Sequence, residues 1–551
     1  MRDRYQTVGS RKREITSLII IALSIHLLML IHDIASNYYP FLWGDRGTGR
    51  WEAMLALVQS EPTSYLSHLA GAEVGPGEYL LQLPSYLIGG RAGIIIFQIS
   101  LSVLSTVCLY EATAILLPWN RAPFICALIY SLLPQSIVFP HQFTTEAVAT
   151  PFCTFFLYLM ARSLRQNRLP AALWGGLCYG IAIFVRPSLA LALPALLLLP
   201  ILYSSRQRQV ATVRGVAICA VASLPLALWV AAFTGTTGRI GYTSGVANLG
   251  WNLRSKVFLV YAENGWAEPP ELARFLEYAQ LYADTGGGIS VPRYLELVSE
   301  HPVSFAKDAV ISLGQVLWRG NVTKLFIDYL RIAADQKIKD LPKNVLGAGN
   351  TGALLDAMRG NVGFISILLL EAVFSLANIC FVFIGVGFLL FALARPQKVS
   401  SKIGSVAFQS MLIIASILFG VIASSEIVDA AQARLRNPVE AGLVILCSLF
   451  FFYRHRAGED GEPVTIPRLR SGGEELNEAV SNLGVIWAGP KTAGRGNGMK
   501  RRVMVELTAG DGTVRTHEIS TGASNTAECS AATVVGGCEF CRFLNSLSYM
   551  R

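Results

Sequence analysis

The sequence predicts an all-α polytopic membrane protein with about ten transmembrane helices, and three observations lead to this prediction. Hydrophobic residues make up 52% of the 551-residue chain, whereas charged residues make up only 15%. Apolar runs near twenty residues, the length that crosses a bilayer, recur along the chain. Basic residues collect in alternate short connections between these runs, so the net charge of +9 indicates membrane topology and not a nucleic-acid partner.

Each apolar run is expected to form a helix, because hydrocarbon leaves no water to satisfy an open backbone. The candidate spans are 15–31, 92–117, 121–139, 143–163, 171–185, 188–204, 211–233, 364–391, 403–423 and 438–454. The first follows a basic cluster, Arg11 to Arg13, and has no small-residue cleavage site after it. We therefore expect a retained first helix and not a signal peptide.

The orientation follows from the connections. With the N-terminus inside, every inside connection is basic and nearly free of acids, as the positive-inside rule requires. These connections carry Arg121; Arg162, Arg165 and Arg168; Arg206, Arg208 and Arg214; Arg395, Lys398 and Lys402; and Arg454 and Arg456. The loops 32–91 and 234–360 then share the outer face, and the second is long enough to form a small layer on the membrane domain.

The first outer loop holds an acid, Asp45, between an aromatic-rich approach and a short amphipathic run, Arg50 to Val58. Apolar residues recur in that run at helical spacing, at Trp51, Met54, Leu55 and Val58. One face of this run can therefore lie on a bilayer or on a protein core. The loop is either a connection with an interfacial helix or an active-site loop whose acid acts on lipid-borne substrates.

Ionisable residues near the spans are candidates for a functional site, because charge is costly inside a membrane. They gather at the predicted outer helix ends, on the side of Asp45: His141, Glu146, Arg186, Glu371, Arg434, Arg436 and Glu440. Any one of them could simply extend to the interface. Their joint placement, with acids and arginines together, favours a site. No spacing of His, Cys and Asp predicts a protein-built metal centre.

Five stretches point to a family. They read WGDRGTGRWEAMLAL, GPGEYLLQLPSYLIGGRAGIIIFQ, FPHQFTTEAVATPFCTFFLYLMARSL, GLCYGIAIFVRPSLALALP and ARLRNPVEAGLVI. In this order they resemble the polytopic C-type-fold glycosyltransferases that use polyprenyl-phosphate sugars, in particular the bacterial relatives of protein mannosyltransferases and lipid A aminoarabinose transferases. The chain departs from the family pattern at Gly47 and Thr48, where a second acid is common, and at Leu435, where Tyr is usual.

The resemblance implies transfer of a sugar from a polyprenyl-phosphate donor to a cell-envelope polysaccharide, lipopolysaccharide or lipid acceptor. The reaction would take place at the outer face of a bacterial inner membrane, with the N-terminus and the C-terminal tail in the cytoplasm. Asp45 matches the first-loop acid of the family and is the expected general base, and Asp33, at the outer mouth of the first span, is its rival. Glu146 resembles the second loop acid and would orient the acceptor, position Asp45 or help to hold a divalent cation, Mg²⁺ or Mn²⁺.

Further site residues follow from the same resemblance. Arginine pairs bidentately with phosphate, so the expected ligands of the donor phosphate are Arg186, Arg434 and Arg436. The expected donor or acceptor contacts are Arg50, Trp51, His141 and Glu371. Two alternatives stay open, a transporter or flippase of lipid-linked glycans and a non-catalytic envelope-assembly protein. A transporter would place ionisable residues near mid-membrane on broken, internally repeated helices.

The composition changes after Arg456, which predicts a membrane domain, 1–456, and a polar cytoplasmic tail, 457–551. The stretch RRVMVELTAGDGTVRTHEIS predicts a pair of strands around an Asp-Gly turn. Part of the tail, VELTAGDGTVRTHEISTGASNTAECSAAT, resembles the beginning of some insertion-sequence transposases. The tail is therefore either a passenger from a mobile element or a small regulatory or partner-binding module.

Overall fold

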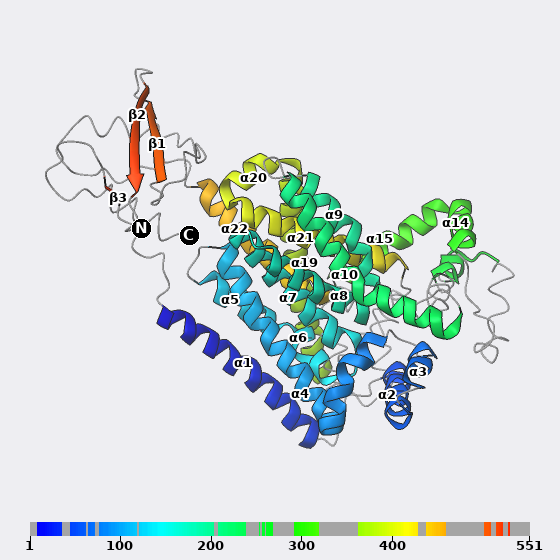
Figure 1. Cartoon of the computed structure of the whole chain (residues 1–551). Coiled ribbons are helices and arrows are strands. Elements are labelled where there is room, and N and C mark those ends of the chain that lie inside the picture. Colours follow the sequence, from blue (N-terminus) through cyan, green and yellow to red (C-terminus); the bar gives the residue numbers. More distant parts are fainter. Residues whose placement is uncertain are drawn as a thin grey trace. The chain divides into compact units, whose positions relative to one another are not determined.

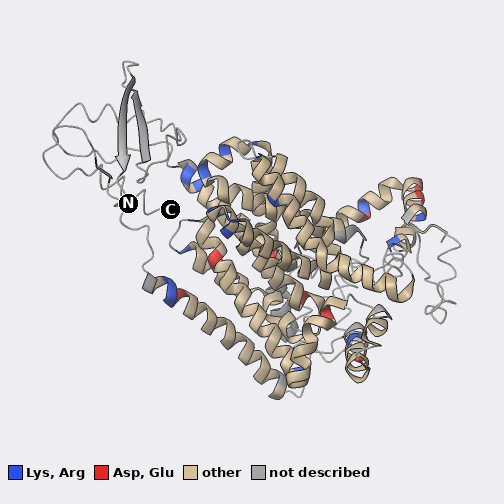
Figure 2. Cartoon of the chain, in the orientation of Figure 1, with Lys and Arg blue, Asp and Glu red and all other residues tan. Residues whose placement is uncertain are grey.

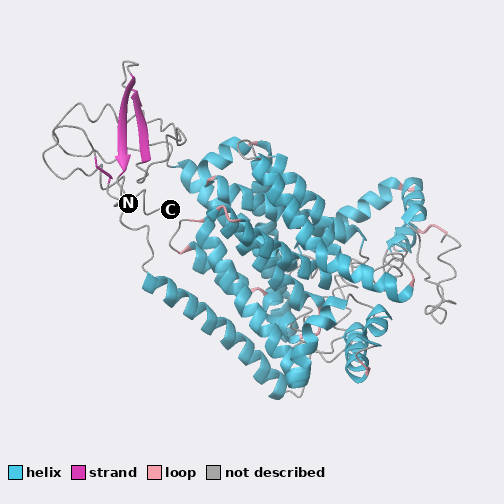
Figure 3. Cartoon of the chain, viewed as in Figure 1, coloured by secondary structure: helices cyan, strands magenta, loops and turns pink. Residues whose placement is uncertain are grey.

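The computed structural model describes two units that the contacts within the chain define, Met1–Gly458 and Glu459–Arg551. The described residues are 8–35, 44–61, 64–71, 76–117, 121–202, 208–238, 253, 256–258, 260–267, 291–318, 362–427, 437–458, 501–508, 514–521 and 527–528. In the described part, the first unit is built of helices and the second contains strands (Figures 1 and 3).

The helices of the first unit follow one another with short connections in its central part. They are α1 (Val8–Ala35), α2 (Gly44–Gln59), α3 (Tyr65–Gly71), α4 (Pro76–Leu116), α5 (Ala122–Leu132), α6 (Pro134–Val138), η3 (Phe139–His141), α7 (Thr145–Gln166), α8 (Leu169–Val185), η4 (Pro187–Ala192), α9 (Leu193–Leu202), α10 (Arg208–Thr237), α14 (Val291–Glu300), α15 (Pro302–Trp318), α19 (Val362–Ala394), α20 (Pro396–Ile403), α21 (Ser405–Ile427) and α22 (Asn437–Gly458). Here η marks a 3-10 helix.

Seven helices among the described residues are long and apolar enough to cross a membrane: α1, α4, α7, α10, α19, α21 and α22. An eighth span results if α5 and the segment Pro134–His141, which are bent by 66°, cross together. The predicted spans 171–185 and 188–204 coincide with shorter apolar helices, Leu169–Val185 and Pro187–Leu202. The all-α polytopic class is thus confirmed, with fewer full-length spans in the described part than the sequence predicted.

Helix α4 is folded back on itself. Its 41 residues are interrupted at Gly89 and Gly90, and Gly90 has a φ of 58°. The amide of Gln98 donates to the amide oxygen of Gln82 at 3.1 Å, although the two are 16 positions apart. In a straight helix they would be separated by about 24 Å. The segment before the glycines therefore lies back against the segment after them (Figure 1).

The main hydrophobic core lies between α4, α7, α8, α9, α21 and α22. At its centre the rings of Phe156 and Tyr179 are 4.8 Å apart, and the Tyr179 hydroxyl donates to the carbonyl of Leu189 at 2.9 Å. Large apolar side chains also face outward, among them Leu27, Leu104, Leu228 and Phe383. Such exposure along the spans is expected of side chains that contact lipid.

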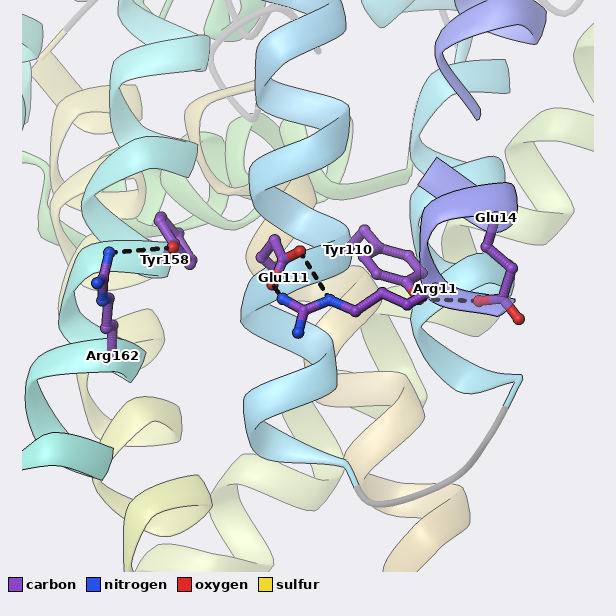
Figure 4. A network of polar contacts seen from close by, with 6 residues as sticks. All are labelled: Arg11, Glu14, Tyr110, Glu111, Tyr158 and Arg162. Carbon is purple, nitrogen blue, oxygen red and sulfur yellow. Dashed lines mark hydrogen bonds and ion pairs between the residues drawn. The ribbon is translucent and has the colours of Figure 1, made fainter. Parts of the chain in front are cut away.

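A polar network joins α1 to α4 (Figure 4). The guanidinium of Arg11 pairs with Glu111, and its Nε donates to Oε1 at 3.2 Å. The Tyr110 hydroxyl donates to a carboxylate oxygen of Glu14 at 2.9 Å. Arg11 and Glu14 are three positions apart and so share one face of α1. The network thus fixes the start of α1 beside the last turns of α4.

The second outer loop of the predicted topology, 234–360, contains α14 and α15. These helices share a small apolar cluster with the short segment near residue 260, made of Val257, Val260, Tyr261, Leu297 and Phe305. The ammonium of Lys256 lies 3.4 Å from a carboxylate oxygen of Asp308 and ties the same two parts together. This segment therefore has a packed core of its own.

The second unit contains β1 (Arg501–Thr508), β2 (Val514–Thr521) and β3 (Ala527–Glu528). Strands β1 and β2 pair antiparallel, with Arg501 opposite Thr521 and Thr508 opposite Val514. The predicted strand pair is thus confirmed, whereas its Asp-Gly turn lies outside the described residues. Short β3 pairs with the end of β2.

Candidate active site

Two buried acids stand at the beginnings of two helices. Glu78 is in the first turn of α4 and Glu146 is in the first turn of α7, with 0% and 3% of their surfaces exposed. The backbone N–H groups at a helix start carry a partial positive charge, which favours a carboxylate there. The helix start therefore stabilises the carboxylate form of both acids, whereas burial opposes that form because it removes the acids from water.

An arginine that follows α8 pairs with the second of these acids. Arg186 Nη1 lies 3.2 Å from Glu146 Oε1, and the Thr145 hydroxyl donates to the other oxygen, Oε2, at 3.1 Å. Arg186 is 9% exposed, so both partners of the ion pair are shielded from water. A buried charge without its partner would carry a large desolvation cost, so the two side chains depend on each other.

A second pair lies next to the first. Arg50 Nη1 of α2 is 3.9 Å from a carboxylate oxygen of Glu78, and neither Glu78 oxygen accepts a hydrogen bond from the described residues. Glu146 is close enough to act on Glu78 electrostatically. We call Arg50, Glu78, Glu146 and Arg186 the acid–arginine cluster. Two arginines and two acids are thus buried together.

Close backbone packing brings α4 to the end of α8. A Cβ atom added to Gly77 would lie 2.6 Å from the carbonyl oxygen of Phe184, nearer than Cβ contacts allow. Glycine at this position therefore lets the first turn of α4 touch the last turn of α8. As a result, Glu78 lies close to the turn that carries Arg186.

Aromatic side chains border the cluster on the side of α2. The ring of Trp51 meets those of Tyr86 and Phe143 edge-on, with centroids 5.5 Å and 6.0 Å away, and the Arg91 guanidinium lies 5.9 Å from its centroid. Met54 is fully buried on the same helix. The predicted amphipathic run is thus a helix whose apolar face packs on the protein.

Glu146 also lines a cavity of about 20 Å³ with Glu440, the acid in the first turn of α22. Tyr130, Gln135 and Thr150 are further polar lining residues. A cavity of this size holds about one water molecule, and its polar walls offer partners for it. Glu440 at the start of α22 therefore faces the same cavity as Glu146 at the start of α7.

Comparisons with known proteins place this region in a family context. Residues 76–230 match the sequence model of the dolichyl-phosphate-mannose-protein mannosyltransferase family. That range contains Glu78, Glu146 and Arg186, and it agrees with the resemblance to protein mannosyltransferases noted in the sequence motifs. No curated protein sequence matches the chain.

One solved structure with similarity is the Archaeoglobus fulgidus oligosaccharyltransferase, tethered with an acceptor peptide that contains the NVT sequon. The sequence identity is 14% and the TM-score is 0.40. The similarity covers 81% of this chain and 51% of that protein, so this chain spans about half its length.

The structure brings together four of the predicted site residues: Glu146 and Arg186 form an ion pair, and Arg50 and Trp51 are neighbours on α2. His141 contacts a different residue, His26 of α1. It is 1% exposed, and its Nε2 lies 3.1 Å from Nδ1 of His26 in α1. In this position His141 joins η3 to the first helix and is not a residue of an open loop.

For three other predicted site residues, the structure describes only their positions in helices. Asp45 is in the first turn of α2, before Arg50, Asp33 is near the end of α1, and Glu371 is in α19. Their side chains are not among the described ones. Arg434 and Arg436 lie outside the described residues, so their roles stay predictions.

Sequence reasoning missed Glu78 as a site residue. The acid lies within GPGEYLLQLPSYLIGGRAGIIIFQ, a stretch whose apolar composition indicates the approach to a span and not part of a site. The available signal was an acid at a helix start, after Pro76 and Gly77, followed by apolar residues. Glu440 was noted at the start of the last span, but its proximity to Glu146 was not predicted.

A divalent cation was the one cofactor that the family resemblance left open. Among the described side chains, no three or more His, Cys, Asp and Glu residues come close enough to hold a metal ion. Glu78 and Glu146 are two carboxylates, and each is near an arginine. The described donors therefore do not form a metal-binding set.

Proposed function

We propose that this protein is a membrane glycosyltransferase. It would move a sugar from a polyprenyl-phosphate donor to a hydroxyl group of a cell-envelope glycan or lipid, at the outer face of a bacterial inner membrane. The observation that carries the proposal is the buried acid–arginine cluster, most of which lies in the range that matches the mannosyltransferase family. Structural packing alone rarely calls for two acids and two arginines buried side by side.

The chemistry needs a base and a site for a phosphate. As the acceptor oxygen forms a bond to the anomeric carbon, its proton passes to a carboxylate. The bond between that carbon and the phosphate oxygen breaks, and polyprenyl phosphate leaves with the electron pair. A positioned carboxylate accelerates such a step by about 10²–10⁴-fold. Arginine stabilises the leaving phosphate because it stays charged and donates two parallel hydrogen bonds.

Asp45 and the residues of the acid–arginine cluster then have separate roles. Asp45 is the base, through its match to the first-loop acid and its place on the helix that carries Arg50. Arg186 binds the donor phosphate, because its contact with Glu146 uses one of the five N–H donors of a guanidinium. Glu146 holds Arg186 in position, and Glu78 does the same for Arg50. Direct displacement would invert the configuration of the sugar.

The test is sugar transfer by the purified full-length protein in nanodiscs, with a panel of polyprenyl-phosphate sugars and envelope glycolipids. We expect Asp45→Asn to lower transfer by about 10²–10⁴-fold. Asp33→Asn is the matched control, because it removes a neighbouring acid of the same face, and deletion of 459–551 tests whether the tail is a passenger. Loss of transfer with Asp33→Asn alone would move the base to that residue.

A transporter of lipid-linked glycans is the second candidate function. Transporters build their sites from broken helices, and here α4 folds back at Gly89 and Gly90 while α5 meets the next segment at 66°. In liposomes, movement of a fluorescent lipid-linked glycan between leaflets without transfer to any acceptor would favour this candidate and reject the glycosyltransferase.

A further inference from the structure

A large groove lies at the end of the bundle opposite to the acid–arginine cluster. Helix α7 begins at the cluster with Glu146 and reaches the groove at Leu164 and Asn167. Its 22 residues span about 33 Å, close to the ~30 Å thickness of a bilayer core. The groove and the candidate active site therefore face opposite leaflets.

The groove has a volume of about 810 Å³, within the range of ~300–1,000 Å³ that is usual for ligand sites. Its walls come from α7, α9, α10, α20 and α21. Apolar side chains form the deeper part: Phe156, Met160, Leu196, Ile218, Phe408 and Ile413. A chain of CH₂ groups would meet apolar surface along this part of the groove.

The rim of the groove is basic. Arg208 and Arg214 of α10 line it, and no Asp or Glu is among its described lining residues. Arg214 Nη2 donates to the side-chain oxygen of Asn167 at 2.8 Å, and its buried Nε has no hydrogen-bond partner among the described residues. The rim also presents Gln397 and Ser400 of α20. Figure 2 shows Lys and Arg gathered at this helix.

The surroundings of the groove are apolar and open. On the neighbouring surface of α9 and α10, exposed side chains include Leu198, Leu202, Val213 and Val216. Side chains of this kind contact lipid in a membrane protein. A ligand can therefore reach the groove sideways from a leaflet, with its polar end at the level of the arginines.

We propose that this groove binds an anionic phospholipid, with the phosphate at Arg208 and Arg214 and one acyl chain between α7, α9, α10 and α21. Charge complementarity favours an anionic headgroup over a zwitterionic one, because the rim carries cations and the described lining has no carboxylate. The lipid would fill the space between these helices and stabilise the end of the bundle remote from the reaction.

The experiment counts bound lipid on the detergent-purified full-length protein by native mass spectrometry. The protein is titrated with dioleoylphosphatidylglycerol and, separately, with dioleoylphosphatidylcholine. We expect Arg208→Gln with Arg214→Gln to weaken phosphatidylglycerol binding by about 25-fold, since each arginine near a lipid phosphate contributes about fivefold. The control pair, Arg165→Gln with Arg168→Gln, removes the same charge from exposed positions outside the groove lining and should leave binding unchanged.

A second variant tests the proposal in case the loss of two arginines disturbs folding. Ala211→Phe keeps both arginines but fills the groove, and it should also reduce bound phosphatidylglycerol. Equal retention of the two lipids, or equal losses in the two double variants, would overturn the proposal. Displacement of phosphatidylglycerol by polyprenyl phosphate at much lower concentration would also overturn it, because the groove would then be a donor site.

Discussion

The ion pair between Glu146 and Arg186 provides the sharpest test of the site. In Arg186→Gln, a carboxylate that is 3% exposed loses the cation 3.2 Å away from it. Breaking a buried pair by removing one partner costs about 3–5 kcal/mol. The Glu146→Gln variant should cost a similar amount, because it leaves the guanidinium buried without that partner.

The double variant, Glu146→Gln with Arg186→Gln, removes both charges and should be more stable than the sum of the single effects predicts. The expected coupling energy is about 2–3 kcal/mol. The assay is unfolding of the purified protein in mixed micelles of dodecyl maltoside and increasing dodecyl sulfate, followed by circular dichroism. Arg165→Gln, an exposed arginine near the other end of α7, is the control and should change stability by less than ~0.5 kcal/mol.

The same variants separate structure from function. If Arg186 binds the donor phosphate, its loss should lower sugar transfer by about 10–150-fold, which corresponds to about 1.5–3 kcal/mol for a charged hydrogen bond. The double variant should regain stability without regaining transfer. A coupling energy below ~0.5 kcal/mol would refute the buried-pair argument, and transfer that recovers together with stability would refute the phosphate role.

Two further predictions concern the fold. Gly90→Ala should destabilise the protein by about 1–2 kcal/mol, because Gly90 has a φ of 58°. Gly89→Ala is the control and should change stability by less than ~0.5 kcal/mol, because Gly89 has a φ of −142° and open space around it. Equal effects of the two variants in the same unfolding assay would contradict the role assigned to the bend. Arg11→Ala should cost at most about 1 kcal/mol, because 51% of the Arg11 side chain is exposed in its pair with Glu111, and added salt should reduce the difference. A larger loss that salt does not change would show that the pair is shielded from solvent.

The sequence by itself determined where most of the apolar helices of the membrane unit lie, although α4 begins at Pro76, within the predicted outer loop 32–91. Length and hydropathy of an apolar run are properties of neighbouring residues, and a bilayer forces such runs to become helices because their backbone groups need partners. The strand pair of the second unit was predictable for the same local reason, from alternation on either side of a turn sequence. Glu146 and Arg186 became candidate residues for a similar local reason, since each lies at an end of an apolar helix.

Only the tertiary structure decided which of these residues meet. Glu78 joins the acid–arginine cluster because α4 folds back at Gly89 and Gly90 and because Gly77 admits close contact with Phe184. No periodicity in the sequence encodes either event. His141 pairs with His26 across 115 positions of the chain, and the walls of the groove come from α7, α9, α10, α20 and α21. Contacts of this kind depend on how whole helices pack, and helix packing is decided by complementary surfaces that lie far apart in the sequence.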